Sequence, residues 1–237
     1  MCSLQYIIIS ATSSRVIISF VFGHKDTGRR GCRKYVLYRR LTNVVDCTFD
    51  EDENIGKSDT FQHLTIKGIN ACLIPKHITK DITSLYNNAH SNETLKKDPD
   101  GIFLIEDNGM KYIYIVEMKS SYTKDNIVKA KNQVVGAYLK LHSLFSLLQS
   151  YNASDWIVRG IIVSFSPTAE KVMGFIKNNN IENSFCNKFQ RDKKYKMPEE
   201  NCKRFFSPLN VPEITLYHVA VPGKADSHVV DFKNIII

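Results

Sequence analysis

The sequence predicts an α/β protein with a central mixed β-sheet flanked by helices and an additional β-rich region at the N-terminus. Residues 4–75 are dominated by short runs of β-branched and aromatic residues, which Gly, Asp and Asn interrupt at short intervals. Residues 98–165 combine apolar, strand-like runs with a long amphipathic segment of helical periodicity. The 237 residues suit one compact domain, which we divide into a β-rich region, 1–75, and a core, 76–237.

The first elements are predicted as strands of an antiparallel region packed on the core. Their sequences are QYIIIS, RVIISFVF, KYVLYRR and FQHLTIKGI. The apolar N-terminus resembles a signal peptide in hydropathy, but it lacks basic residues at its start and is split by Arg15, so two strands explain it better. The acidic stretch at residues 50–54 is interpreted as a loop.

The later elements alternate between helices and strands. Apolar residues at helical spacing predict a helix over ITKDITSLYNNA and a longer helix over residues 125–150, for which Thr123 or Asp125 supplies the N-cap. The runs WIVRGIIVSFS and EITLYHVAVPG are predicted as strands. Between them, TAEKVMGFIKNN is predicted as a helix that Pro167 and Thr168 open.

Charge and cysteine content restrict the cellular setting. The formal net charge of +8 and the pI near 9.1 suit a nucleic-acid partner or simply a solvated basic surface, and charge alone leaves both open. The six cysteines form no CxxC or Cys/His metal pattern, which favours reduced thiols in a cytoplasmic protein. We expect no association with a membrane.

A hairpin at residues 98–120 carries the strongest functional signal. Asn108-Gly109 is the preferred dipeptide of a two-residue turn, because a type I′ turn requires positive φ at both positions. With Asp107 facing Met110, Asp100 falls directly opposite Glu117 on the same face of the ribbon. The two carboxylates are then crowded, with Cβ atoms about 4.5–5.5 Å apart.

A divalent cation would turn this repulsion into a binding site. Strand alternation brings Lys119 to the face of Glu117 and turns Met118 to the other face. Mg²⁺ commonly binds one or two carboxylates together with waters and phosphate oxygens, so we expect Mg²⁺ here, with Mn²⁺ able to substitute. The alternative is structural: Asp100 caps a loop and Glu117 pairs with Lys119 where the strand leaves the core.

The residues Pro99-Asp100 at the start of one strand and Glu117-Met118-Lys119 at the end of the next resemble the motif of the PD-(D/E)xK nuclease superfamily. The resemblance implies a restriction-endonuclease-like core through about residue 165 and covers nothing in residues 1–75 or 178–237. It implies that Asp100, Glu117 and the Met118 carbonyl hold Mg²⁺. It further implies that Lys119 orients or activates the attacking water and steadies the phosphate.

Two further sets of residues extend the resemblance. Recombination-type exonucleases of the superfamily carry a Gln on the helix after the motif, and Gln133 fits that placement, although a solvated surface glutamine explains it equally well. Some members add an acid from a helix before the hairpin, for which Asp81 and Glu93 are the available positions.

Basic residues predict the DNA-contacting surface. Two stretches interleave cations with aromatics, and the polar segment 178–210, interpreted as an insertion or a long loop, contains the second of them. For the first stretch, protection of an exposed strand edge is an equal alternative. The predicted contacts are Arg29, Arg30, Arg33, Lys34, Arg39, Arg40, Lys188, Arg191, Lys193, Lys194 and Lys196, with Lys129 and Lys140 on the polar face of the long helix.

The sequence therefore favours a Mg²⁺-dependent DNA endonuclease of the type II restriction or defence kind, acting as a homodimer if it cuts both strands of a palindrome. The alternatives are a recombination-type exonuclease or structure-specific nuclease, an RNA-cleaving nuclease, and a DNA-binding module without turnover. A nucleotide-hydrolysing enzyme is disfavoured because the glycines at residues 23–28 lack the Lys-Ser/Thr of a phosphate loop.

Overall fold

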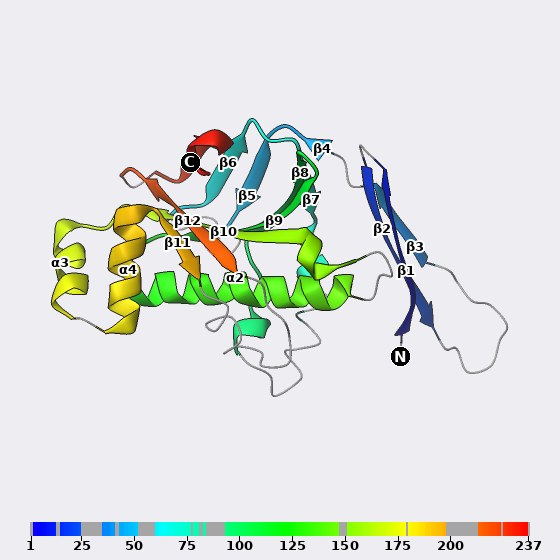
Figure 1. The fold of residues 1–237 in the computed structure, drawn as a ribbon, viewed down its shortest axis with the longest axis horizontal. Coiled ribbons are helices and arrows are strands. Elements are labelled where there is room, and N and C mark those ends of the chain that lie inside the picture. The colour runs from blue at the N-terminus through cyan, green and yellow to red at the C-terminus, as the bar shows by residue number, and fades with distance from the viewer. Residues whose placement is uncertain are drawn as a thin grey trace.

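A seven-stranded mixed β-sheet with helices packed on it forms the centre of the protein, which confirms the predicted α/β class (Figure 1). The computed structural model describes residues 2–12, 15–24, 35–40, 43–51, 60–76, 78–80, 83, 93–146, 151–178, 180–197, 213–223 and 225–236. The strand order is β11-β12-β10-β9-β8-β7-β4. These strands are β4 (Asn43–Val44), β7 (Ala71–Ile74), β8 (Gly101–Asp107), β9 (Met110–Lys119), β10 (Trp156–Phe165), β11 (Lys194–Met197) and β12 (Ile214–Val221).

Antiparallel and parallel pairing divide this sheet into two parts. β7, β8 and β9 form an antiparallel meander, whereas β9, β10 and β12 run parallel. The crossover from β9 to β10 passes through α2 (Lys124–Phe145), which lies along one face of the sheet (Figure 1). Thr123 caps α2, because its hydroxyl accepts a hydrogen bond from the Asn126 N–H, as predicted.

The segment after β10 is more regular than its composition suggested. α3 (Ala169–Lys177) begins after its predicted cap, Thr168. The prediction of a polar insertion or loop was wrong for the described part of 178–210, which forms α4 (Ile181–Asp192) and the edge strand β11. Phe185 and Phe189, one helical turn apart, are buried against the core and hold α4 in place. Residues 198–212 lie outside the described residues.

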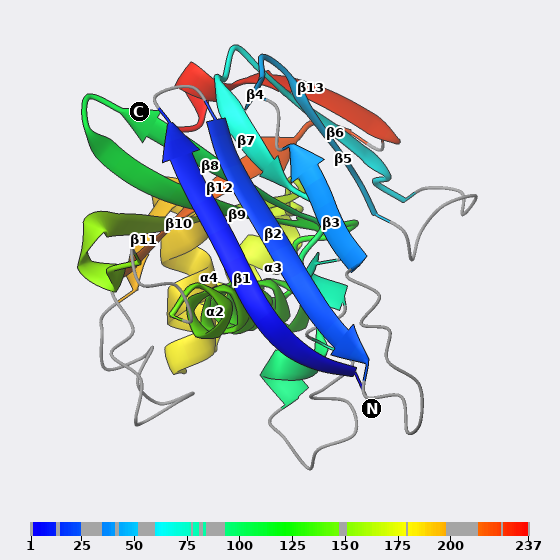
Figure 2. The same ribbon diagram turned by 90° about the vertical axis from the view of Figure 1, so that its right-hand side faces the viewer.

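The N-terminal residues form the predicted strands, of which the first three make a sheet of their own and the later ones join other sheets. β1 (Cys2–Thr12), β2 (Arg15–His24) and β3 (Tyr35–Arg40) make a three-stranded antiparallel sheet (Figure 2). A second small sheet joins β5 (Cys47–Asp50) and β6 (His63–Lys67) to the C-terminal β13 (Ser227–Asp231). The division at residue 75 was wrong, because β4 and β7 belong to the central sheet and β6 pairs with β13.

The remaining short elements connect these layers. They are the 3-10 helices η1 (Glu93–Lys96), η2 (Ala153–Asp155) and η3 (Phe232–Asn234). Of the helix predicted at 78–89, residues 78–80 and 83 are helical and the others lie outside the described residues. Cys47, Cys72 and Cys186 are buried, free thiols. In the described part of the chain, no helix combines the length and apolar character needed to cross a membrane.

Strand alternation divides the buried side chains between the two faces of the sheet. On β9, Ile113 and Ile115 face the core under α2, whereas Tyr114, Val116 and Met118 face the second core, which β5 and β6 cover. Glu117 continues the series of Ile113 and Ile115. A carboxylate therefore stands where the pattern calls for an apolar side chain of the α2 core.

Candidate active site

The predicted hairpin register is confirmed as far as Gly101↔Val116, one residue short of the predicted Asp100–Glu117 pair. Asn108 and Gly109 have φ of 50° and 77°, and the ladder runs from Asp107↔Met110 to Gly101↔Val116. One step further, the Asp100 N–H donates to the Val116 carbonyl at 3.1 Å, and Asp100 Oδ2 accepts from the Met118 N–H at 2.6 Å. The Asp100 carboxylate is thus fixed against the main chain of the Glu117-Met118 pair.

Glu117 and Lys119 form a buried ion pair next to Asp100. The Glu117 side chain is 2% exposed and that of Lys119 13% exposed, and Lys119 Nζ donates to Glu117 Oε1. The other oxygen, Glu117 Oε2, is buried and has no hydrogen-bond partner among the described residues. An unpaired carboxylate oxygen in a core is costly, because it lacks the compensation that a hydrogen bond or a cation would provide.

Glu51 is a third acid of the site, and sequence reasoning missed it by assigning residues 50–54 to a loop. The Glu51 side chain is buried, and its charge acts on Asp100, Glu117 and Lys119. Its N–H donates to the Gln62 carbonyl at 2.9 Å. Cys47 and Phe49 are buried while Thr48 and Asp50 are exposed, so Glu51 continues an inward series of period two. That alternation was the available signal.

Gly101 allows the segment carrying Glu51 to approach the hairpin. A Cβ atom on Gly101 would stand 2.0 Å from Cδ1 of Phe49, which lies two residues before Glu51. Only glycine leaves room for the Phe49 ring at this position. The glycine of the Pro-Asp-Gly sequence therefore has a packing role next to the acid.

Burial and mutual repulsion raise the pKa of both acids on the hairpin. Burial, then the charge of Glu51, raises the pKa of Asp100 to about 7, against the lowering effects of the Met118 N–H, Lys119 and Lys76. Burial, then the charge of Asp100, raises the pKa of Glu117 well above its ordinary value. Burial lowers the pKa of Lys119, but the charge and hydrogen bond of Glu117 outweigh it and raise that pKa. Added positive charge would relieve this repulsion.

The carboxylates of Asp100 and Glu117 suit a hard divalent cation that takes its remaining ligands from water or substrate. In the described ranges, no group of three or more His, Cys, Asp and Glu side chains is arranged so that it could hold a metal ion by itself. Asp100 and Glu117 instead offer two carboxylates, one with an unpartnered oxygen. Mg²⁺ ordinarily takes one or two carboxylates and completes its shell with waters and phosphate oxygens. The residues present fit that ion.

Gln133 is buried rather than on the solvated surface, which removes the structural alternative considered for it. Its side chain is 7% exposed, and Nε2 donates to the Asp98 carbonyl at 3.4 Å. It therefore contacts the segment that leads into Asp100. Its Oε1 has no partner among the described residues.

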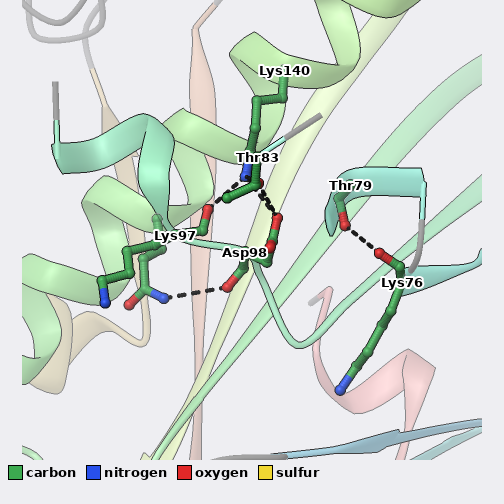
Figure 3. A network of polar contacts seen from close by, with 7 residues as sticks. Lys76, Thr79, Thr83, Lys97, Asp98 and Lys140 are labelled. Atoms are coloured by element: carbon green, nitrogen blue, oxygen red, sulfur yellow. Dashed lines mark hydrogen bonds and ion pairs between the residues drawn. The ribbon is translucent and has the colours of Figure 1, made fainter. Parts of the chain in front are cut away.

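Lys140 was wrongly predicted to contact nucleic acid, because it is completely buried. Its Nζ donates to Asp98 Oδ1 at 2.8 Å, to the Lys97 carbonyl at 2.6 Å and to Thr83 Oγ1 at 2.6 Å (Figure 3). Burial lowers its pKa, against the raising effect of Asp98. Lys140 therefore ties the residues just before Pro99-Asp100 to α2, so that its role is to position the site.

Ser164 and His218 place a second pair of polar side chains on the strands next to Lys119. Ser164 lies opposite Lys119 in the β9–β10 register, and its hydroxyl contacts His218 Nε2 of β12 at 3.0 Å. Burial, then the charge of Lys193, lowers the pKa of His218 to about 3. The imidazole is therefore neutral near pH 7 and serves as a structural hydrogen-bonding group rather than an acid.

The other predicted DNA contacts divide by position. Lys129 on α2 is exposed. The exposed cations of α4, β11 and the residue between them are Lys188, Arg191, Lys193, Lys194 and Lys196. Two of them form ion pairs, Arg191 with Asp192 and Lys196 with Glu213. The side chains of Arg39 and Arg40 in β3 lie outside the described residues, as do Arg29, Arg30, Arg33 and Lys34 and the candidate acid Asp81.

Comparisons with protein-family models, curated proteins and solved structures give no match for this chain. Its function must therefore be inferred from the site itself.

Replacing Lys140 with methionine tests its structural role. Lys140→Met leaves the Asp98 carboxylate and the Lys97 carbonyl without their buried partner, so we expect the free energy of unfolding to fall by about 3 kcal/mol. Urea denaturation measures this loss. Lys129→Met, on an exposed position of the same helix, is the control and should change stability by less than about 0.5 kcal/mol. Equal effects of the two substitutions would contradict the assignment.

The pKa of Asp100 gives stability a definite dependence on pH. An acid whose pKa is about 7 in the folded state and near 3.8 when unfolded binds more protons when folded, so its contribution to stability is lost as pH rises between these values. In EDTA, we expect the free energy of unfolding of the wild type to decline by up to about 1.4 kcal/mol per pH unit, and Asp100→Asn should remove this decline. Thermal and urea unfolding from pH 4 to 7 measure it. The exposed Asp107→Asn at the turn should keep the wild-type slope.

Proposed function

We propose that this protein is a Mg²⁺-dependent DNA endonuclease of the PD-(D/E)xK type. The observation that carries the proposal is the arrangement of Asp100, Glu117 and Lys119. The partly buried Asp100 lies beside the buried Glu117, which has one unpartnered oxygen and one oxygen bonded to the Lys119 amine. A purely structural ion pair needs Lys119 and Glu117 alone. With the hydrogen bond from the Met118 N–H it also accounts for Asp100, but it explains neither the unpartnered Glu117 Oε2 nor the charge of Glu51 beside both acids.

The order of elements supports a restriction-endonuclease-like core. An antiparallel meander, β7-β8-β9, leads through α2 into β10, which runs parallel to β9. The acids stand at the start of β8 and the end of β9, where the superfamily motif requires them. This agreement extends the resemblance from residues 99–119 to the strand-helix-strand unit that follows.

Asp100 and Glu117 would hold the Mg²⁺, with the Met118 carbonyl as a further ligand and Glu51 close enough to add its charge. When bound, the ion neutralises charge on the phosphate oxygens and lowers the pKa of a water ligand. The Met118 N–H fixes Asp100 by a hydrogen bond at 2.6 Å, so this acid is oriented before substrate arrives.

Lys119 places a positively charged side chain of the protein next to the proposed metal ligands. Its side chain is partly accessible, whereas its partner Glu117 is almost fully buried. Once a cation compensates Glu117, the ammonium group is available to donate hydrogen bonds to a phosphate oxygen or to the attacking water. Its raised pKa keeps it protonated near pH 7, which favours orienting and electrostatic roles over that of a general base.

DNA is the proposed substrate because of the basic surface. The net charge is +8, and the exposed cations of α4, β11 and α2 offer contacts to the phosphate backbone. An enzyme of restriction or defence type that cuts both strands at a symmetric sequence would act as a homodimer.

Substitution of the three residues tests the proposal directly. We expect Asp100→Asn, Glu117→Gln and Lys119→Ala each to reduce Mg²⁺-dependent cleavage of supercoiled plasmid at least about a hundredfold, because the first two remove a carboxylate that would hold Mg²⁺ and the third removes the positive charge that would steady the phosphate. EDTA should abolish cleavage by the wild type. Gel analysis of plasmid forms and circular dichroism measure activity and folding.

The turn end of the same hairpin supplies matched controls. The controls change the same residue types at the end of the hairpin far from the site: Asp107→Asn and Glu106→Gln on β8, and Lys111→Ala on β9. These variants should cut as the wild type does. Undiminished cutting by all three site variants would end the proposal.

Gln133 favours a second candidate, a recombination-type exonuclease that starts at DNA ends. Its buried contact with Asp98 puts it beside the segment that carries Asp100, which agrees with the place of the Gln in that branch. The topology of the substrate separates the two candidates. An endonuclease gives discrete fragments from circular plasmid, whereas an exonuclease degrades linear DNA progressively and leaves closed circles intact. We expect cutting of the circle, as followed by gel electrophoresis over time.

A further inference from the structure

The outer face of α3 and the start of α4 expose a group of apolar side chains. Of the large hydrophobic side chains that are exposed in the described residues, half lie between residues 173 and 181. Met173 is 51% exposed, Ile176 is 52% exposed, and Ile181, the first residue of α4, is 89% exposed. Single exposed hydrophobic residues are common, whereas a group of them marks an interaction surface. This group therefore makes α3 a candidate contact with a partner.

Gly174 lies beside Met173, and nothing in the described part of the chain requires a glycine there. Its φ is not positive, and a Cβ atom added to it would have no neighbour within 4 Å. A glycine inside a helix is unfavourable relative to alanine. A second helix that crosses α3 would account for it, because two helix backbones approach most closely where side chains are small.

The charges on this face are self-complementary. Glu170, Met173, Gly174 and Lys177 recur at i, i+3, i+4 and i+7, so they share one face of α3. Glu170 and Lys177 are exposed and form no ion pair within the described residues. When two copies of α3 lie antiparallel about a two-fold axis between residues 173 and 174, Glu170 of each copy faces Lys177 of the other. The same arrangement brings the two Met173 side chains together.

We propose that α3 is the contact between two copies of this chain in a two-fold symmetric dimer. A second copy is the partner because the two ends of the face carry opposite charges, and an antiparallel copy satisfies both at once. The face consists of one short helix and the start of the next, so the interface is small. We expect a dissociation constant on the order of 10 µM.

This surface lies at the end of the sheet that carries the proposed active site. β10 leads into α3, and Ser164 near the end of β10 lies opposite Lys119. The start of α4 lies beside the start of α2, because Lys124 Nζ is 3.5 Å from Glu182 Oε2 (Figure 1). The consequence for cleavage rests on the proposed function: the dimer brings two active sites to one duplex, so that both strands of a closed circle are cut.

Sedimentation equilibrium of the full chain, at concentrations on either side of about 10 µM, tests association without any cleavage. We expect the mass to rise from the 27.1 kDa of one chain to twice that value. Met173→Glu should weaken association at least about tenfold, because it places two like charges at the axis. Gly174→Gln should also weaken it without lowering the melting temperature, since nothing in the described residues meets its side chain.

Met110→Glu is the matched control, because Met110 is 48% exposed and lies at the turn of the hairpin. This variant should associate as the wild type does. A wild type that stays monomeric throughout, or equal effects of Met110→Glu and Met173→Glu, would overturn the proposal.

Charge reversal tests the predicted pairing across the axis. Glu170→Lys and Lys177→Glu should each weaken association roughly tenfold when studied alone, because each puts like charges opposite one another twice. An equimolar mixture of the two variants should restore the wild-type affinity, because both pairs of the mixed dimer again have opposite charges. A defect in the folding of either variant gives no such rescue. A mixture that associates no better than its components contradicts the arrangement.

Plasmid cleavage keeps this inference separate from the nuclease assignment. Met173→Glu should accumulate nicked circles at protein concentrations at which the wild type produces linear DNA. A wild type that stays monomeric while it cleaves removes the dimer assignment alone. A wild type that dimerises through α3 without Mg²⁺-dependent cleavage removes the nuclease assignment alone.

Discussion

Repulsion between neighbouring acids at the open end of one hairpin is the constraint on which the rest of this structure depends. Asp100 and Glu117 lie side by side with Glu51 nearby, and the pKa of both hairpin acids is raised by burial and by the neighbouring carboxylates. Such an arrangement destabilises a fold unless something compensates it. Lys119 compensates one oxygen of Glu117 and leaves the other without a partner. The proposed cation would compensate the remaining negative charge of these acids.

The surrounding elements can be understood as the support that keeps these acids in place. The two positive-φ residues of the turn fix the register, and the Met118 N–H holds the Asp100 carboxylate. Lys140 fastens the preceding residues to α2, and Gly101 admits the ring of Phe49. Each contact is independent of the others, so the site is held from the hairpin, from the helix and from the small β5–β6 sheet at once.

The sequence by itself determined the local features that follow from periodicity and turn chemistry. Asn108-Gly109 fixed the hairpin register from Asp107↔Met110 to Gly101↔Val116, strand alternation put Lys119 on the face of Glu117, and Thr123 and Thr168 marked where α2 and α3 begin. Period-two alternation also carried the signal for Glu51, although the acidic run around it suggested a loop. These features depend on neighbours within a few residues or across one turn.

Only the tertiary structure decided the burial of charged side chains and the partners of distant segments. Lys140 and Gln133 look like surface residues in a helical pattern, and their burial depends on the segment around Lys97 and Asp98 that covers them. The pairing of β6 with β13, and the packing of α4 through Phe185 and Phe189, join residues far apart in the chain. Helical or strand periodicity specifies which face a side chain occupies. It does not specify which other segment covers that face, because that depends on contacts between elements whose separation along the chain is arbitrary.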